Sequence, residues 1–292
     1  MTIRSRQRTP GGHARRTRRV RRASAGLTPV RAGAALAMVA AAAAIYGVGA
    51  APAFTFTGLD LSGIRYTDEA AVRERLAIPD GTNLFRLETE PLEARLRELP
   101  TVERASVEVR LPGTLAVQIA ERTPILVWRV GNRRFLADRE GALFAELGGQ
   151  PSEEARSLPQ VDDQRATSAQ LALGDRLAGV DLDAATRLGS LRPADVGSAA
   201  GRLRLQLTDQ NGYVVRAEPQ AWLAIFGYYT PSLRTPAMIP DQVRLLRSLL
   251  LEEGERNVVR IVLASETDGT FTTPRPSNEP ASSGEPEASA TP

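Results

Sequence analysis

An uncharged, mostly apolar run from Ala32 to Ala53 constrains this chain more than any other feature of its sequence. About 20 residues of helix, at roughly 1.5 Å per residue, span about 30 Å, which is the thickness of the hydrocarbon core of a bilayer. Ala and Gly dominate the run, and only a few larger apolar side chains raise its hydropathy. The length and the absence of charge predict a membrane-spanning helix over residues 32–53.

The residues before this run are strongly basic and predict the orientation of the helix. Residues 1–31 contain no acidic residue and ten arginines: Arg4, Arg6, Arg8, Arg15, Arg16, Arg18, Arg19, Arg21, Arg22 and Arg31. Because basic flanks stay in the cytoplasm, we expect residues 1–31 to form a cytoplasmic tail and the C-terminal bulk to be exported across the cell membrane in a single pass.

Two other interpretations of the N-terminal region remain open. Ala51-Pro52-Ala53 has the small-x-small pattern of a signal-peptide cleavage site. The arginines could also form an arm that binds nucleic acid. The long basic region and Pro52 favour an uncleaved anchor. The position of the arginines beside an apolar run favours a topology signal that lies near anionic lipid head groups.

The charge of the exported part differs from that of the whole chain, whose formal net charge is +3. Ten of the 37 basic residues precede residue 32, whereas all 34 acidic residues follow it, so residues 32–292 carry a formal charge of −7. We therefore expect the exported part to have no general affinity for nucleic acid.

The residue types present exclude most enzyme chemistry. The chain contains no Cys and no Lys, and its one histidine, His13, lies in the basic tail. Thiol and Ser-Lys nucleophiles, Ser-His-Asp triads, disulfides and His or Cys metal sites are thereby excluded for the exported part. The adjacent Asp162 and Asp163 are more typical of a solvated loop than of an acid–base pair. We expect no enzyme, no cofactor and no metal.

The pattern over residues 54–122 predicts a small α+β domain. Alternating apolar residues over 54–63 indicate a strand, and Thr67 and Thr89 are predicted N-caps of two short helices. The apolar faces of these helices carry Val72 and Leu76 in the first, and Leu92, Leu96 and Leu99 in the second. After Val107 the apolar period changes to two, and Pro112-Gly113 divides a β-hairpin. The order is β-α-α-β-β, with two helices available to cover one face of a sheet.

Five short motifs in this region carry a family resemblance. They are Leu61-Ser62-Gly63, Gly81-Thr82-Asn83-Leu84-Phe85, Leu99-Pro100-Thr101-Val102-Glu103-Arg104-Ala105-Ser106-Val107, Arg110-Leu111-Pro112-Gly113-Thr114-Leu115 and Glu121-Arg122-Thr123-Pro124. In this order, behind one anchor and a basic tail, they make residues 54–122 resemble the POTRA domain of the bacterial cell-division family FtsQ, also called DivIB. Individually, the motif residues are typical of packing and turns.

Residues 123–265 resemble the β-rich second domain of that family. Strands are predicted over 125–130 and 134–138, followed by a turn that Asp138 and Gly141 form. One or two short helices are expected within 163–200, and Asn211-Gly212 predicts a hairpin. A helix opens at Pro240-Asp241, and a strand follows over Val258–Leu263. Residues 266–292 are rich in Pro, Ser, Thr, Glu and Ala, which predicts a disordered tail.

The resemblance also implies a partner site. In this family the final strand lies at a sheet edge and pairs with a β-segment of FtsB, a small bitopic protein that accompanies FtsL. The corresponding residues here are Val258, Val259, Arg260, Ile261, Val262 and Leu263, and a buried strand is the alternative interpretation. The family often has a Lys near the start of the preceding helix, where this chain has Gln242. Trp222, Tyr228 and Tyr229 are a second candidate surface, an aromatic patch, although core packing explains aromatic residues more often.

The sequence thus predicts an α+β membrane protein: a single transmembrane helix, a β-α-α-β-β POTRA domain, and a β-rich domain with a C-terminal helix and strand. The resemblance implies a non-catalytic scaffold at the division septum that links FtsB and FtsL to the septal peptidoglycan machinery. The alternative is a membrane-anchored POTRA binding module of an export or envelope-assembly system. An outer-membrane pore would need many further strands after Leu263.

Overall fold

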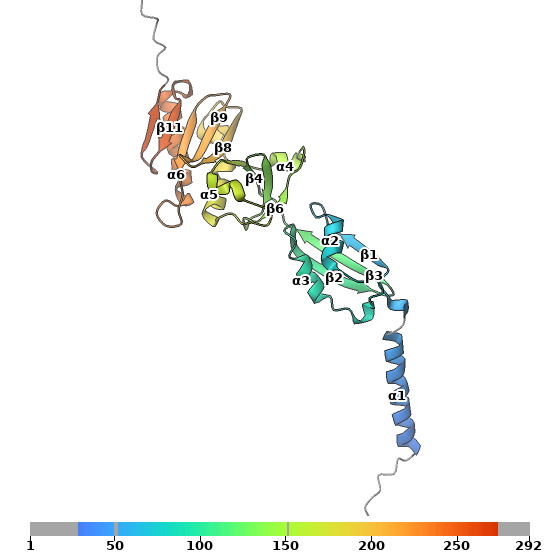
Figure 1. The fold of residues 1–292 in the computed structure, drawn as a ribbon. Coiled ribbons are helices and arrows are strands. Elements are labelled where there is room, and N and C mark those ends of the chain that lie inside the picture. The colour runs from blue at the N-terminus through green and yellow to red at the C-terminus, as the bar shows by residue number, and fades with distance from the viewer. Residues whose placement is uncertain (1–28, 50–51, 151, 274–292) are drawn as a thin grey trace, which may run out of the picture.

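The computed structural model describes residues 29–49, 52–150 and 152–273, and the architecture is elongated (Figure 1). A single helix comes first, a three-stranded sheet with two helices follows, and a nine-stranded sheet with further helices lies farthest from the first helix. The predicted fold class is confirmed: α+β, with an apolar N-terminal helix, a β-α-α-β-β unit and a β-rich region that contains a C-terminal helix.

Helix α1 (Pro29–Gly49) begins and ends earlier than the predicted range of residues 32–53. Proline is well tolerated at the start of a helix, and Pro52 opens a separate 3₁₀ turn (Pro52–Phe54) because it cannot donate a helical hydrogen bond. By length and composition Pro29–Gly47, with a mean hydropathy of 1.6, can cross a membrane, and among the described residues no other helix can. Residues 1–28 of the predicted cytoplasmic tail, and Ala51 of the predicted cleavage pattern, lie outside the described residues.

The first sheet has the order β1-β3-β2, with β1 (Gly58–Ser62) parallel to β3 (Thr114–Glu121) and β2 (Val102–Arg110) antiparallel to it. Helices α2 (Glu69–Leu76) and α3 (Glu90–Leu96) pack together and against the sheet. Their predicted apolar faces are buried, apart from the half-buried Leu99, and they share one core with the inward side chains of β2 and β3: Val107, Leu115, Val117 and Ile119.

The cap of α2 differs from the prediction. Asp68, not Thr67, is the N-cap, and its side chain accepts a hydrogen bond from the main-chain N–H of Ala70. The Thr67 hydroxyl instead lies 2.7 Å from that of Thr101, which begins the approach to β2. Thr89 does precede α3, but its side chain makes no capping hydrogen bond. Long-range contacts thus redirect a threonine that local spacing alone would place at the helix end.

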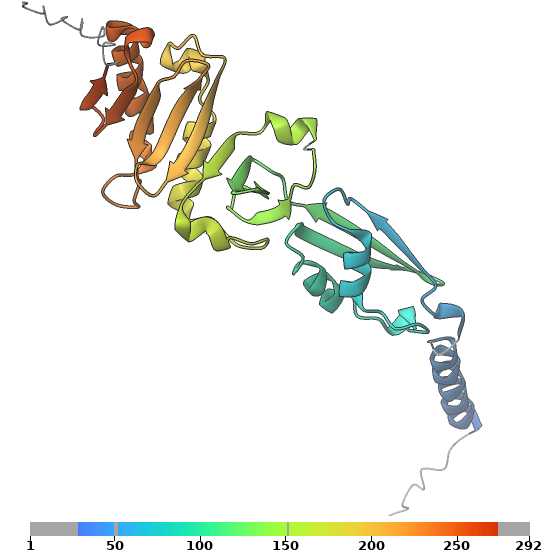
Figure 2. The same cartoon turned by 45° about the horizontal axis from the view of Figure 1, so that its top comes forward.

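The second sheet has the order β12-β11-β10-β9-β8-β7-β4-β5-β6. Its strands are β4 (Leu126–Val130), β5 (Arg133–Ala137), β6 (Leu143–Glu146), β7 (Gln160–Asp163), β8 (Arg202–Thr208), β9 (Gly212–Glu218), β10 (Leu223–Gly227), β11 (Arg260–Leu263) and β12 (Gly269–Thr272). The hairpin predicted at Asn211-Gly212 joins β8 to β9, and Gly212 there adopts a positive φ of 64°. Figure 2 shows β11 and β12, in red, at the end of the sheet farthest from α1.

Helices lie on both faces of this sheet. The main core lies beneath α5 (Gly179–Gly189) and α6 (Ile239–Glu253), and it includes the largest buried aromatic residues of the region: Trp128, Phe135, Tyr213, Trp222 and Phe226. A smaller cluster lies beneath α4 (Glu153–Ser157) and contains Val127, Leu136 and Phe144. The helices predicted within 163–200 are α5 and two 3₁₀ turns, Ala166–Gln170 and Pro193–Val196.

A network of charged residues joins the two sheets, where β3 continues almost directly into β4. Arg122 donates to the carbonyl of Pro100 (3.0 Å) and forms an ion pair with Asp138 (2.6 Å). Asp138, which is 2% exposed, also accepts hydrogen bonds from the main-chain N–H groups of Glu140 and Ala142. Asp138 therefore forms the predicted turn and, in addition, ties that turn to the first sheet.

The C-terminal end of the sheet corrects two predictions. Residues 269–272, expected to be part of a disordered tail, form β12, which pairs antiparallel with β11. Strand β11 consequently lies between β10 and β12 and is not the edge strand. A Thr-Phe-Thr segment has the β-propensity for this strand, but its polar surroundings concealed it in the sequence. The remainder of the expected tail, residues 274–292, lies outside the described ranges.

Candidate partner-binding edge of the sheet

The predicted partner residues, Val258 to Leu263, lie at and around β11. Within β11 itself, the side chains alternate between the core beneath α6 and the opposite, outer face of the sheet. Val258, Ile261 and Leu263 are buried in the core, whereas Val259 and Arg260 are exposed. The main chain, not the buried side chains, is therefore the part of β11 that a neighbouring strand can recognise.

The main chain of β11 is fully engaged in the sheet on both sides. On one side Arg260, Ile261 and Val262 pair in parallel with β10, and on the other side residues 260–263 pair with β12. Leu223 donates to the carbonyl of Val259 (3.0 Å), and Val259 donates to the carbonyl of Thr272 (2.9 Å). Access to the main chain of β11 from outside the sheet thus depends on β12.

Two side chains hold the C-terminal end of β11 in place. Arg234 donates to the carbonyls of Phe226 and Leu263, both at 2.7 Å, and also to that of Ala264. Gln242, which is completely buried, donates to the carbonyl of Leu263 (3.2 Å) and accepts from the Tyr229 hydroxyl (2.7 Å). These bonds fix β11 to β10 and α6 without using β12.

The candidate aromatic patch is divided between core and surface. Trp222 and Tyr229 are buried, and burial raises the pKa of the Tyr229 hydroxyl. Tyr228 is 43% exposed, and its hydroxyl donates to the carbonyl of Thr208 (2.6 Å). Trp222 and Tyr229 are core residues because the alternation of β10 and the loop that follows it directs them toward α6, so the three do not form a joint surface patch.

Glu255, just after α6, orders the connection between this helix and β11. Its carboxylate accepts hydrogen bonds from the Trp222 indole (2.6 Å), the Ser198 hydroxyl and the main-chain N–H of Ala199 (3.0 Å). Burial opposes ionisation of Glu255, but these three donors outweigh it, so the pKa of Glu255 is lowered. Sequence reasoning missed Glu255, Arg234 and Gln242 because their partners lie 8 to 57 residues away in the chain.

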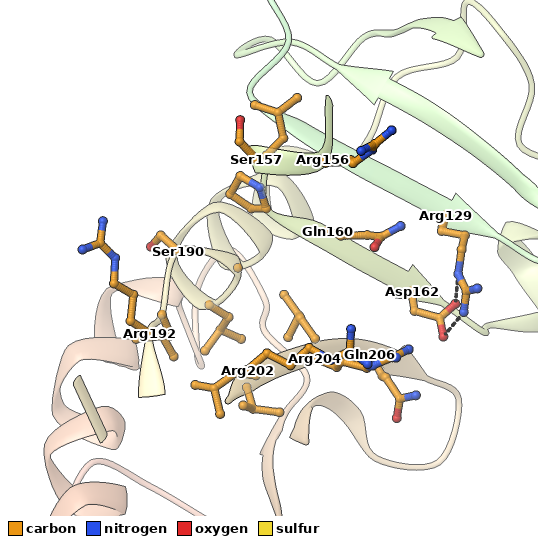
Figure 3. A pocket seen from close by; sticks show the side chains of 18 residues that line it. Arg129, Arg156, Ser157, Gln160, Asp162, Ser190, Arg192, Arg202, Arg204 and Gln206 are labelled. Carbon is orange, nitrogen blue, oxygen red and sulfur yellow. Dashed lines mark hydrogen bonds and ion pairs between the residues drawn. The ribbon is translucent and has the colours of Figure 1, made fainter. Parts of the chain in front are cut away.

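A second feature of this region is an open cavity of about 610 Å³ between β7 and β8 (Figure 3). Strand β7 pairs only with Leu205, Gln206 and Leu207 of β8, and the cavity lies beside the unpaired start of β8. Five arginines are among its lining residues: Arg129, Arg156, Arg192, Arg202 and Arg204.

The charges around this cavity are largely paired with one another. Arg129 forms an ion pair with Asp162 (2.7 Å), drawn with dashed lines in Figure 3, and Arg202 and Arg204 both pair with Glu218 (2.5 and 2.6 Å). The hydroxyls of Ser157 and Ser190 donate to main-chain carbonyls of their own helices. These serines are not activated nucleophiles, and the described residues contain no group of His, Cys, Asp or Glu that could hold a metal ion.

Comparisons with known proteins agree with this architecture. A model of the FtsQ-type POTRA domain matches residues 55–122. The chain is 31% identical over 133 residues to "Cell division protein FtsQ" of Streptomyces coelicolor, which covers 41% of this chain and 50% of that protein. It is 31% identical over 141 residues to the protein of the same name from Streptomyces collinus (47% and 52% covered), and 29% over 125 residues to that of Rhizobium meliloti (43% and 40%).

The matched stretches thus span about half the length, or less, of these curated relatives. The POTRA match at residues 55–122 covers the three-stranded unit that carries the resemblance. That unit follows an apolar helix and precedes a large β-sheet with a C-terminal helix and strands, as the family resemblance implies. Residues 55–122 thus match the FtsQ-type POTRA domain family, and the chain is similar over part of its length to curated cell division proteins named FtsQ.

Proposed function

We propose that this chain is a membrane-anchored, non-catalytic scaffold of the bacterial cell-division machinery. Its relatives carry the name of a cell division protein, which favours division over a general export or envelope-assembly role. The apolar helix α1 would cross the cell membrane once, with the arginine-rich N-terminus in the cytoplasm and both sheets outside. The two sheets then form an arm that extends from the membrane (Figure 1).

The partners we propose are bitopic division proteins of the FtsB and FtsL type, which the arm would link to the septal peptidoglycan machinery. Anchoring every component in one membrane raises their effective concentration, so modest affinities are sufficient for assembly. The end of the nine-stranded sheet at β11 and β12 is the surface that best fits an extended partner segment. A strand edge offers N–H and C=O groups in a regular row, and an added strand satisfies them.

The observation that carries this proposal is the rigid attachment of an exposed sheet end to a POTRA unit. The junction at Arg122 and Asp138 couples the two sheets, while β12 lies at the far end of the arm. Such an arrangement positions a binding edge at a fixed distance from the membrane. The cavity between β7 and β8 supports a binding role less well, because Arg129, Arg202 and Arg204 in its lining already form ion pairs within the chain.

Localisation tests the division role. An N-terminal fluorescent fusion should form a band at midcell, and depletion of the native protein should produce filamentous cells. A uniform membrane signal together with normal cell length after depletion would contradict the division role and favour the envelope-assembly alternative.

A co-purification experiment tests the partner site. The full chain, extracted in mild detergent, should retain the FtsB-type protein of the same organism. Replacement of Ile261 by Pro in β11 should reduce this retention at least about tenfold, because proline removes a main-chain donor and breaks the extended geometry of the strand. Replacement of Glu146 by Pro in β6, the strand at the opposite end of the same sheet, is the control, and equal loss in both variants would contradict a site at the C-terminal edge.

A further inference from the structure

The last strand of the sheet is held much less firmly than the strand that it covers. Strand β12 contributes four residues, of which Thr270 and Thr272 are exposed and only Phe271 packs against the core cluster. The turn before it is closed by local hydrogen bonds from the main chain of Thr267 and Asp268 to the Ser265 hydroxyl. Within the described part of the chain, no ion pair involves residues 264–273.

Side-chain hydrogen bonds from other elements hold the chain up to Ala264, but not the strand after it. Up to this residue, the side chains of Arg234 and Gln242 bind the carbonyls of Leu263 and Ala264. Beyond it, the contacts of β12 are mainly main-chain pairs with β11, which solvent or another strand can replace. If β12 leaves, Ile261 and Leu263 remain buried beneath α6, and β11 remains paired with β10.

We propose that β12 is a displaceable cover strand, and that an extended peptide from another molecule takes its place on β11. The identification of that peptide as part of a division partner rests on the proposed function, whereas the displacement itself does not. The peptide pairs antiparallel with residues 260–263, in the register that β12 itself occupies.

The side chains around β12 define which peptide fits. Gly269 pairs with Leu263, and a Cβ added to Gly269 would lie 3.0 Å from the side chain of Leu249 and 3.3 Å from that of Leu245. Two residues later on the same face, Phe271 packs on the core beside Ile261. A competing strand therefore fits best with a small residue at the first position and a large apolar residue at the third, with polar residues between and after them.

Attachment of β12 to the same chain makes it a strong competitor. A strand tethered by a short turn has an effective concentration on the order of millimolar. A peptide in solution therefore binds weakly while β12 occupies β11. When β12 is weakened, the apparent affinity of the peptide rises in proportion to the fraction of molecules in which β11 is uncovered. The proposed cover thus sets a threshold for strand addition.

A reversible covalent lock tests the displacement. The chain contains no cysteine, so Val262→Cys with Thr270→Cys introduces the only thiols, at directly opposite positions on β11 and β12. The probe is a fluorescent peptide with the sequence of residues 265–273, added to the full chain in detergent. We expect the reduced chain to bind it and the oxidised chain to bind at least about tenfold more weakly.

Matched variants separate displacement from nonspecific effects. Arg204→Cys with Arg216→Cys forms an opposite pair on β8 and β9, and its oxidation should leave peptide binding unchanged. Gly269→Val in the full chain should strengthen binding of the unmodified peptide about tenfold, because the added side chain weakens the tethered strand. The same change within the peptide should weaken its binding about tenfold.

Hydrogen exchange gives a readout that needs no added peptide. Amides of residues 269–272 and of the β11 edge facing them should exchange through a local opening, at least about tenfold faster than those of β9. Exchange of both regions only through global unfolding, or equal peptide binding to the locked and reduced chains, would overturn the proposal. If the peptide behaves as expected but the FtsB-type protein does not bind any form, the cover strand stands and the proposed partner is wrong.

Discussion

The two ends of the nine-stranded sheet are built on opposite principles. At the end next to the POTRA unit, a buried carboxylate, an arginine and several main-chain groups converge on one turn. At the far end, a four-residue strand with one half-buried aromatic side chain completes the sheet. A buried, multiply bonded junction transmits orientation, whereas a short polar edge strand can be exchanged. The molecule thus combines a fixed joint with a replaceable end.

The junction also contains a second carboxylate, Glu121, that organises the main chain. It accepts hydrogen bonds from the N–H groups of Arg65, Tyr66 and Thr67, at 2.7 to 2.9 Å. The ring of Tyr66 in turn contacts that of Phe144 in the second sheet, at 5.8 Å between centroids. The joint therefore has both polar and apolar contacts, and these prevent either sheet from rotating freely about the connection.

Among the variants that compare the two ends, leaving the control variants aside, the largest expected effect is that of Asp138→Ala at the junction. The change leaves Arg122, which is itself mostly buried, without its ion-pair partner and removes the acceptor of two main-chain N–H groups. We expect a loss of about 3 kcal/mol in the free energy of unfolding. Urea unfolding of the full chain in detergent, followed by tryptophan fluorescence, measures it.

Asp60→Ala is the control for this prediction. Asp60 pairs with Arg110 on the exposed surface of the first sheet, where the loss should be below about 0.5 kcal/mol. Equal losses for the two variants would mean that the junction is no more constrained than an exposed ion pair.

Gln242→Leu tests the hydrogen bonds of Gln242 to Tyr229 and Leu263, which hold the end of β11 in place independently of β12. The change removes the acceptor of the buried Tyr229 hydroxyl and one of the donors to the Leu263 carbonyl. We expect the free energy of unfolding to fall by about 2 kcal/mol. The double variant with Tyr229→Phe should cost less than the sum of the single variants, because it also removes the unpaired hydroxyl. Strict additivity in urea unfolding would show that the two side chains act independently.

The pH dependence tests a property that the two ends share, a carboxylate whose ionised form is stabilised by hydrogen bonds. Burial opposes ionisation of Glu121 and Glu255, but hydrogen bonds lower the pKa of both below the ordinary value in the folded chain. Their stabilisation is therefore complete above the unfolded pKa of about 4.3 and is lost as the pH falls through the folded pKa. We expect the free energy of unfolding to decrease below about pH 4.3. Glu255→Gln should reduce this dependence, and an unchanged profile would contradict the role of Glu255.

The smallest expected effect is that of Phe271→Ala in β12. The side chain is only partly buried, so global unfolding should change by less than about 1 kcal/mol, while exchange of the β12 amides accelerates. Phe226→Ala, in the completely buried centre of β10, is the matched control and should cost about 3 to 5 kcal/mol. A global loss from Phe271→Ala as large as that from Phe226→Ala would remove the contrast between the two ends.

Much of the fold was predictable where residues that a local pattern places on one face of a helix or strand are also the residues buried in the core. Val72, Leu76, Leu92 and Leu96 repeat at helical spacing, and all four are buried on one sheet. The hairpin at Asn211-Gly212 follows from the positive φ that its glycine must adopt. Strand β12 was not predictable, because Gly-Thr-Phe-Thr has too few apolar residues to differ from its flanking polar segment. It becomes a strand only because β11 offers a complementary edge.

By itself, the sequence determined the apolar helix, the order of the first α+β unit and the absence of cysteine, histidine and lysine chemistry from residues 32–292, because these depend on residue type and short-range spacing. The tertiary structure alone decided that Thr67 is not the cap of α2, that Trp222 and Tyr229 are core residues, and that β11 is covered. Each of these depends on contacts between residues far apart in the chain, whose energies no local pattern encodes.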